Sequence, residues 1–356
     1  MFHERDLPLD RREWDAIFLS AMGSPDPNGR QLNGMGGGVT SVSKVCVIGP
    51  PSRADADVDY TFAQVLVKEA RVSYKGNCGN MSAAVGPFAV DEDLVAAFDG
   101  STTVRIHNTN TSKIIRSTFN VLKGRAAIEG DLSIPGVAGT GSPVKLDFLD
   151  PGGAITGKLL PSGNVMDSMQ VDGLGEIQLS IVDAANPCVF VHAASLGMTG
   201  VEMPEALERD ALLMEKLISI GAHAALAMGF ACTAQEARKR LPLIAVVSAP
   251  QDNPTLSGEL VPAAASDLVL RMLSSGQPHR ALPGTGSICA AVAARIPGTI
   301  PHRLTRDSGG AAVRLAMPSG VLTVDASVHD QAGRWAASHG TLFRTARRLF
   351  AGAVYY

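Results

Sequence analysis

Gly76-Asn-Cys-Gly-Asn-Met-Ser-Ala-Ala-Val85 aligns without a gap with Pro283-Gly-Thr-Gly-Ser-Ile-Cys-Ala-Ala-Val292, 207 positions later in the chain. Each segment reads as a glycine turn, a capping residue (Asn80 or Ser287) and a helix of small residues. An alanine-rich helix with almost no charge has to be buried on all sides. The two segments therefore predict two similar domains, with chance similarity between two Gly/Ala stretches as the alternative.

Short β-rich runs dominate the rest of the chain. The runs that read as strands between turn residues are 44–48, 65–67, 104–106, 144–146, 177–182 and 321–324. The predicted helices are fewer, and they cover Asp10–Met22, a stretch from near Asn80, parts of Pro204–Met228 and Thr233–Arg240, a stretch from near Ser287, and Gln331–Ala353. Because strands and helices do not alternate regularly, a doubly wound parallel sheet is disfavoured. We predict an α/β (α+β) fold in which each domain is a curved sheet wrapped round one helix.

The composition excludes several classes of protein. The 356 residues are 46% apolar and 18% charged, as in globular proteins, and a net charge of -3 gives no field for binding nucleic acid. The chain contains no uninterrupted apolar stretch that predicts a membrane span, and the polar start Met1-Phe-His-Glu-Arg-Asp6 is unlike a signal peptide. The basic cluster at Arg344, Arg347 and Arg348 is typical of a solvated helix face.

The cysteines and histidines argue against a metal site. The five cysteines include no CxxC pair, and the eight histidines include no HExxH or similarly paired spacing. An odd number of unpaired thiols predicts a reducing, cytoplasmic compartment.

The starts of the two predicted helices are candidate anion sites. A helix N-terminus offers unpaired N–H groups and a positive dipole end, and adjacent glycines let a carboxylate approach closely. The predicted substrate contacts are Asn77, Gly79 and Asn80 in the first segment, and Thr285, Gly286 and Ser287 in the second. The same field favours the thiolate form of Cys78. The alternative is that Cys78 is a small buried filler.

A second proton-carrying group is needed, because Thr285 occupies the position that matches Cys78 and a threonine hydroxyl is a poor acid and base. Lys44 is the best candidate. It follows the glycine-rich run Gly34-Met-Gly-Gly-Gly38 and starts an apolar strand, where partial desolvation favours the neutral amine that a base requires. An ordinary surface lysine is the alternative reading.

Several motifs together resemble those of the 2-methylaconitate cis-trans isomerase (PrpF) family. They occur in family order across nearly the whole chain. The motifs are Met22-Gly-Ser-Pro-Asp-Pro27, Asn33-Gly-Met-Gly-Gly37, Ser43-Lys44, Asp57-Val-Asp-Tyr60 with Gln64, Gly76-Asn-Cys-Gly-Asn80, Gly157-Lys-Leu-Leu-Pro-Ser-Gly163, Val182-Asp-Ala-Ala-Asn-Pro187, Arg295-Ile-Pro-Gly-Thr299 and Pro318-Ser-Gly320.

The resemblance implies a diaminopimelate-epimerase-like fold of two pseudo-symmetric domains, each a curved, mostly antiparallel sheet rolled round a central helix. It also implies an isomerase of unsaturated di- and tricarboxylates that uses neither a metal nor an organic cofactor. The family's activities are cis-trans isomerisation of 2-methylaconitate or aconitate and double-bond migration in 4-oxalomesaconate or methylitaconate. Lys44 and Cys78 occupy the family's catalytic lysine and cysteine positions.

Two departures from the family pattern bear on these expectations. Relatives usually begin with a strand and an Arg-Gly-Gly-Thr-Ser-Lys-Gly motif, so we expect the first strand of the fold to be missing here, at a cost to folding or activity. Met317 stands where many relatives carry histidine, which indicates altered specificity. The expected domains are 1–178 and 179–330, with a C-terminal helix over 331–356 packing back on the first.

The expected mechanism is a proton shift through a dienolate. A base removes a proton γ to a carboxylate, and the helix starts hold the charge that develops there. Lys44 is the preferred base and Cys78 the preferred acid, with the reverse assignment open. Further substrate contacts are expected from Gln64, Asn108, Asn186, Ser319 and Gly320, although asparagine and glycine also serve turns.

Two other functions stay open at this point. An amino-acid epimerase on the same fold is one, although Thr285 in place of a second cysteine speaks against it. A non-catalytic or accessory polycarboxylate-binding relative is the other. The expected partner is a small polycarboxylate, with a homodimer as the default assembly.

Overall fold

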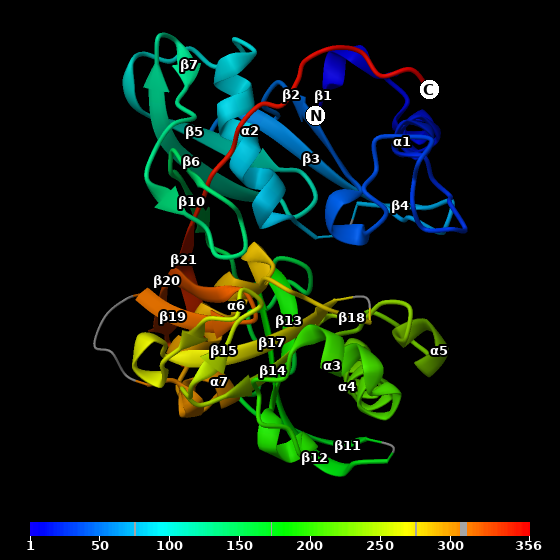
Figure 1. The fold of residues 1–356 in the computed structure, drawn as a ribbon, viewed down its shortest axis with the longest axis vertical. Helices are drawn as coiled ribbons and strands as arrows, with labels where there is room; N and C mark the ends of the chain where they lie inside the picture. The colour runs from blue at the N-terminus through cyan, green and yellow to red at the C-terminus, as the bar shows by residue number, and fades with distance from the viewer. Residues whose placement is uncertain (75, 172, 275, 307–311) are drawn as a thin grey trace. The chain divides into compact units, whose positions relative to one another are not determined.

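The computed structural model describes residues 1–74, 76–171, 173–274, 276–306 and 312–356, and it divides the chain into two units (Figure 1). Unit 1 comprises Met1–Gly130, Gly141–Leu146 and Thr345–Tyr356. Unit 2 comprises Asp131–Thr140 and Asp147–Arg344. The expected limits of 1–178, 179–330 and 331–356 place the main division later in the chain than these units do.

Unit 1 is built on a mixed sheet. Antiparallel neighbours are β2 with β3, β3 with β4, β5 with β6, and β6 with β7, whereas β1 is parallel to β2 and β3 is parallel to β5. The strands are β1 (Phe2–His3), β2 (Lys44–Gly49), β3 (Val58–Val65), β4 (Val72–Ser73), β5 (Gly100–Asn108), β6 (Lys113–Leu122) and β7 (Arg125–Ala126).

The two faces of the β2–β3 pair carry different side chains, because successive residues of a strand point to opposite faces. Val45, Val47, Ala63 and Val65 pack with the apolar side of α1 (Trp14–Met22). The opposite face carries Lys44, Cys46, Tyr60, Phe62 and Gln64. The helix α2 (Gly79–Asp91) contacts β2, β5, β6 and β7. The alternation along β2 and β3 therefore separates a purely apolar core from a face that carries an amine, a thiol and a phenol.

Unit 2 contains a larger, mostly antiparallel sheet, in which β13 with β14 and β17 with β19 are the parallel pairs. Its order is β11–β12–β13–β14–β17–β19–β20–β21, with β18 (Gln277–Pro278) also paired to β17. The bounds are Asp167–Val171, Gly175–Ala184, Asn186–His192, Leu243–Ser248, Leu268–Ser274, Ala312–Met317, Gly320–Gln331 and Arg334–Arg344 in that order. Shorter strands are β8 (Leu132–Ser133), β9 (Thr140–Gly141), β15 (Asn253–Pro254) and β16 (Leu260–Val261), and β10 (Val144–Leu149) contains a junction between the units.

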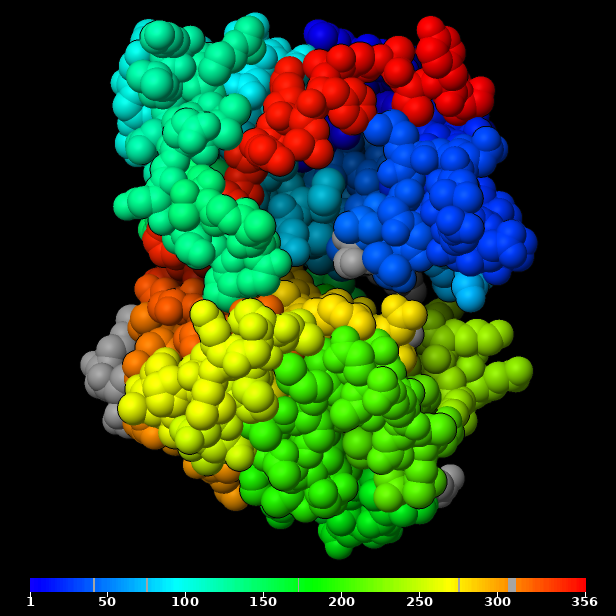
Figure 2. All heavy atoms as spheres, in the orientation of Figure 1, coloured from blue at the N-terminus to red at the C-terminus, as the bar shows by residue number. Residues whose placement is uncertain are grey.

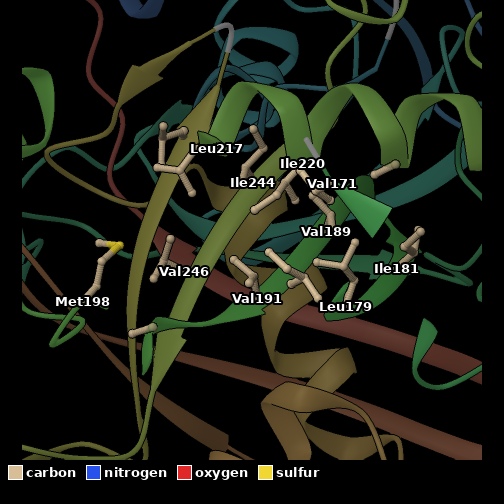
Figure 3. Packing of buried hydrophobic residues seen from close by; sticks show 14 of the residues in the cluster. Val171, Leu179, Ile181, Val189, Val191, Met198, Leu217, Ile220, Ile244 and Val246 are labelled. Carbon is tan, nitrogen blue, oxygen red and sulfur yellow. The ribbon is translucent and has the colours of Figure 1, made fainter. Parts of the chain in front are cut away.

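Helices cover both faces of the unit 2 sheet. Leu217 and Ile220 of α4 (Ala211–Ala227) pack on alternate residues of β12, β13 and β14, as the labelled side chains in Figure 3 show. On the opposite face, α6 (Gly284–Arg295) approaches Leu243 and Met272 so closely that a Cβ on Gly286 would lie 2.5 Å from the Met272 sulfur. The remaining helices are α3 (Pro204–Arg209), α5 (Ala234–Ala237) and α7 (Ile300–Leu304).

The mixed α/β class, the predominance of antiparallel pairs and a helix of small residues in each unit are confirmed. Every residue of α6 from Gly284 to Ala294 is buried, as its uncharged sequence predicts. The start of α2 at Gly79 agrees with the expected start near Asn80, whereas α6 begins at Gly284, three residues before the expected start near Ser287. Among the described residues, no helix has the length and hydropathy needed to cross a bilayer.

The predicted C-terminal helix is wrong. The segment forms the end of β20 and the whole of β21, joined by a two-residue turn in which Ala332 and Gly333 both have positive φ. That backbone suits the twist of a hairpin and cannot continue a helix. Residues 345–356, all within the described chain, form neither helix nor strand; they are drawn in red, lying over the surface of unit 1 in Figure 2.

Candidate active site

Lys44 is the first residue of β2, and the register of the sheet fixes its surroundings. It lies directly opposite Gln64 of β3, and Cys46 lies opposite Phe62 on the same face. The Lys44 ammonium lies 5.9 Å from the centre of the Phe62 ring, within reach of a cation–π interaction. The side chain is half-buried, so its amine is partly covered by protein and partly accessible to solvent.

Cys78 is the residue that precedes the first turn of α2. Its backbone is extended, with φ -121° and ψ 105°, and its carbonyl accepts the N–H of Ser82 at 2.9 Å. The first N–H groups of an α-helix have no carbonyl partner within the helix, and they give that end a partial positive charge. The Cys78 side chain is 9% exposed and lies at this end.

The structure brings the two predicted catalytic side chains together. Lys44 Nζ lies 3.2 Å from Cys78 Sγ, within hydrogen-bonding distance for a sulfur partner. The contact joins a strand and a helix 34 positions apart in the chain. A proton can pass directly between an amine and a thiol at this distance, and either group can face a substrate carbon as base or acid.

A buried polar cluster lies behind Cys78. Ser82 Oγ is within hydrogen-bonding distance of Asn77 Oδ1 at 3.1 Å and of the Cys78 carbonyl at 3.0 Å. The Cys46 thiol lies 3.9 Å from the Tyr60 hydroxyl. Burial raises the pKa of the Cys46 thiol to about 12 and raises the pKa of Tyr60 well above its ordinary value. Both groups therefore stay protonated near neutral pH and act as neutral neighbours of the Lys44–Cys78 pair.

The other unit 1 residues that were predicted to contact the substrate differ in their burial and in their hydrogen bonds. Gly79 is the buried first residue of α2, and Asn80 is exposed in its first turn. Asn108 is fully buried, and its Oδ1 accepts the N–H groups of Asn110 and Thr111, as a turn-forming asparagine does. Gln64 Nε2 lies within hydrogen-bonding distance of three backbone carbonyls, those of Thr40, Ser43 and Val65. Asn108 and Gln64 therefore make structural contacts within the protein.

The unit 2 residues that were predicted to contact the substrate are buried or half-buried within the unit. Thr285, Gly286 and Ser287 are buried in the first turn of α6, where the Ser287 hydroxyl donates to the Pro283 carbonyl at 3.0 Å. Asn186 begins β13 after a tight turn at Ala185 (φ 60°).

Ser319 lies in the two-residue turn between β19 and β20, and Gly320 is the first residue of β20. This turn lies against Pro135 and Gly136 of the same unit. The nearby Met317 Sδ accepts the Leu282 N–H at 3.2 Å, which is a packing contact rather than a site for a titrating group.

Two residues near the site, Gln31 and Ser82, were not found by sequence reasoning. Gln31 is 1% exposed, and its amide contacts Ser43, the residue before Lys44. Ser82 contacts both Asn77 and the Cys78 carbonyl. The available signal was the position of Ser82 four residues after Cys78, since serine hydroxyls often bond to the carbonyl one helical turn back. No comparable local signal marks Gln31, which is buried through contacts distant in sequence.

The described residues contain no group of three or more His, Cys, Asp or Glu side chains arranged to hold a metal ion. Each of the five cysteines, all at described positions, is a free thiol. The groups that the structure places at the site are the Lys44 amine, the Cys78 thiol and the backbone N–H groups at the start of α2, with the Cys46 thiol and the Tyr60 hydroxyl nearby.

The whole chain, residues 1–356, matches a family model described as PrpF protein. It is 44% identical over 355 residues to the 3-methylitaconate isomerase of Eubacterium barkeri, covering 98% of this chain and 92% of that protein. It is 37% identical to the 2-methyl-aconitate isomerase of Cupriavidus necator, over 96% of this chain and 88% of that one. It is also 37% identical to the 4-oxalomesaconate tautomerase of Pseudomonas putida, over 99% and 91%.

The matches among solved structures agree with these sequence matches. A crystal structure of a methylitaconate-delta-isomerase matches with a TM-score of 0.83 at 43% identity, covering 99% of this chain and 90% of that one. A probable proline racemase from Agrobacterium radiobacter matches with a TM-score of 0.51 at 14% identity, covering 94% and 78%, which shows a shared fold alone.

Proposed function

This chain belongs to the PrpF family and is an isomerase, and from that premise we propose that it moves a proton on a small unsaturated polycarboxylate with Lys44 and Cys78 as its proton carriers. The observation that carries the proposal is the 3.2 Å separation of Lys44 Nζ and Cys78 Sγ at the start of α2. An amine and a thiol in contact can each hold the proton that the other releases, as a 1,3-shift requires.

The proposed reaction has two steps. One member of the pair, as neutral amine or thiolate, takes a proton from the carbon γ to a carboxylate, and the C–H electron pair becomes part of a dienolate. The other member, in its protonated form, returns a proton to a different carbon, which moves the double bond. Alternatively, the dienolate rotates about a bond that has lost double-bond character and is reprotonated at its original carbon, which gives cis-trans isomerisation.

The charge that develops during this reaction sits on the carboxylate of the dienolate. The N–H groups of the first turn of α2, beginning at Gly79, are preorganised donors for it, and such donors are most effective when they need no rearrangement. The Lys44 ammonium supplies a full positive charge when it is protonated. The neutral thiol of Cys46 and phenol of Tyr60 add no negative charge that would oppose an anionic substrate.

The substrate class follows from chemistry shared by the relatives. Methylitaconate, 2-methylaconitate and 4-oxalomesaconate are all unsaturated acids with more than one carboxylate, and each has a C–H bond acidified through a conjugated system. The proposal places this chain in the same class. A reactive thiol requires a reducing compartment, so the proposal also places the enzyme in the cytoplasm. The default assembly is a homodimer, which light scattering would test.

Proton NMR in D₂O tests the function directly. The purified protein is incubated in turn with methylitaconate, 2-methylaconitate, cis- and trans-aconitate and oxalomesaconate. We expect one of these acids to isomerise with deuterium entering at the carbon that gains or exchanges a proton. Binding detected by thermal shift, without isomerisation or exchange of any acid, would instead support an accessory binding protein. Exchange at the α-carbon of an amino acid would support an epimerase.

Variants of the pair test the mechanism. Lys44→Met and Cys78→Ala should each lower kcat by roughly 10²–10⁴-fold, the contribution of a positioned proton carrier. Circular dichroism should show an unchanged fold, because Lys44 is half-buried at a strand end and Cys78 precedes its helix. Either variant retaining more than a tenth of wild-type kcat would remove that residue from the mechanism. Exposed Lys239→Met is the matched control and should retain full activity.

A further inference from the structure

Ser43, the residue before Lys44, is a point at which three hydrogen bonds meet. Its side chain is fully buried. Its hydroxyl contacts Gln31 Nε2 at 2.8 Å, and its carbonyl accepts Gln64 Nε2 at 2.9 Å and the Val65 N–H at 3.1 Å. The backbone that leads into Lys44 is therefore held through side chain and main chain at once.

Gln64 holds this segment from the neighbouring strand. It lies opposite Lys44 in the β2–β3 register, and its amide nitrogen also donates to the Thr40 carbonyl at 3.0 Å. One amide thus joins the carbonyl of the first residue of the short 3-10 turn Thr40–Val42 to the carbonyl of Ser43, which follows the turn. Gln64 Nε2 also lies 3.4 Å from the Val65 carbonyl, so its two donor hydrogens are shared among three carbonyls and Gln64 acts on the loop rather than as a donor to a substrate.

Gln31 holds the same segment from the opposite side. It is 1% exposed, and its amide contacts the hydroxyls of Ser24 and Ser43 and accepts the Gly38 N–H at 3.0 Å. The backbone of Gln31 has a φ of 52°, a left-handed conformation that non-glycine residues keep only where the surroundings enforce it. All three polar positions of this buried amide are used within the protein.

The glycine-rich run Gly34–Gly38 packs closely against the Gln31 side chain. A Cβ added to Gly36 would lie 2.2 Å from Gln31 Cδ and Oε1, so only a glycine allows the chain to pass directly over the amide. The side chains of Val39 and Val42 are about half exposed, so apolar burial contributes little to holding this loop. Hydrogen bonds from the two glutamines are the main restraint on residues 38–43.

We propose that Gln31 and Gln64 are positioning residues that clamp Ser43 from two sides and so deliver the Lys44 amine to Cys78. The inference rests on the proposed function, in which the Lys44–Cys78 pair carries the proton. The clamp acts through Ser43 because the peptide bond between residues 43 and 44 fixes where the Lys44 side chain leaves the strand. Loosening the clamp widens the distribution of the Nζ–Sγ distance without removing either reacting group.

Two readouts test the clamp on the full-length protein. The first is the steady-state split between kcat and KM for the acid that is turned over. The second is the rate of Cys78 alkylation by iodoacetamide, followed by mass spectrometry of the peptide, which needs no substrate. Removing the amine in Lys44→Met should slow alkylation roughly tenfold, because the contact of Lys44 Nζ with Cys78 Sγ at 3.2 Å is lost.

Gln64→Met keeps the length of the side chain and removes the amide, while the Val65 N–H still bonds to Ser43 and keeps β2 paired with β3. We expect kcat to fall about ten- to hundredfold, as for other small misplacements of a reacting group, with KM within twofold of wild type. Alkylation of Cys78 should slow toward the rate of Lys44→Met. In the Lys44→Met background, adding Gln64→Met should change alkylation no further.

Ser43→Ala is the second variant, since it removes only the hydroxyl contact with Gln31 and should lower kcat about threefold to tenfold. Gln170→Met, an exposed glutamine on β11, is the matched control and should leave both readouts unchanged. A rise in KM with unchanged kcat for Gln64→Met would overturn the proposal and assign Gln64 to substrate binding. Equal slowing of alkylation in the wild-type and Lys44→Met backgrounds would also overturn it, because the effect would not pass through Lys44.

If the wild type turns over none of the acids, the proposed function fails. The alkylation cycle still decides whether the two glutamines position the amine.

Discussion

Gly86 and Gly221 lie inside helices that pack on sheets, and replacing each by alanine separates two opposing effects on stability. Alanine is favoured over glycine in a helix interior by about 0.5–1 kcal/mol, and this gain is common to both sites. The difference lies in what the new methyl group meets. At Gly86 in α2 it would lie 2.5 Å from Ser117 Oγ and 2.8 Å from the Phe119 ring.

Ser117 and Phe119 are buried on β6, where strand pairing leaves them little room to move. Overpacking of this kind costs about 1–3 kcal/mol. Pro87 adds to the cost, because a Cβ on the residue before proline disfavours helical backbone. At Gly221 in α4 the nearest atom is the terminal Cδ1 of Ile244 at 2.7 Å, which can rotate away. We therefore expect Gly86→Ala to destabilise the protein by about 1–2 kcal/mol and Gly221→Ala to be neutral or stabilising.

Urea unfolding followed by circular dichroism measures both variants, and turnover provides an independent readout. Gly86→Ala should lower the unfolding midpoint and also kcat, because α2 carries Cys78 at its start and a displaced helix moves the thiol. Gly221→Ala should leave kcat unchanged. Equal shifts of the midpoint for the two variants, or a Gly86→Ala protein with wild-type stability, would refute the close packing of α2 on β6.

Three further perturbations have definite outcomes. Burial pushes the pKa of Asp267 upward, but hydrogen bonds from Arg314 outweigh burial and hold that pKa below its ordinary value. The carboxylate therefore stabilises the fold above about pH 4. Asp267→Asn should cost about 2 kcal/mol at pH 7 in thermal unfolding, and the difference from wild type should shrink as the pH falls below 4. Iodoacetamide at pH 7.5 should label Cys78 but leave Cys46 unmodified by peptide mass spectrometry, because burial raises the pKa of Cys46 to about 12. Ser82→Ala should lower kcat about tenfold in a steady-state assay, with the helix content by circular dichroism unchanged.

Features of the fold that depend on local pattern were predictable from sequence. The apolar run after Lys44 forms β2, and the uncharged alanine-rich segment forms the buried α6. The hairpin of β20 and β21 was not predicted, because alanines and arginines near its end gave the appearance of a helix. The positive φ at Ala332 and Gly333 creates the turn, and that conformation is enforced by pairing between strands.

The candidate site was predictable in its centre and poorly predictable in its surroundings. Lys44 and Cys78 were candidates from their places at the start of a strand and before a helix, the family resemblance made them the expected catalytic pair, and they lie 3.2 Å apart. Gly286 was expected to contact a substrate, yet its missing side chain lets α6 approach Met272. Gln31 was overlooked because its importance comes from contacts with Ser43 and Gly38 that only the folded loop creates.

During translation the two units are completed at different times, because their segments are arranged differently along the chain. Most of unit 2 is one continuous stretch, Asp147–Arg344, so a ribosome completes it in a single pass. Unit 1 also needs Thr345–Tyr356, where Arg348 forms an ion pair with Glu92 at the end of α2 at 2.6 Å. The domain that bears Lys44 and Cys78 therefore begins synthesis first and receives its closing segment only after the other has emerged. The Arg348–Glu92 ion pair at the C-terminal end of α2 can therefore form only after every strand of both units has been translated.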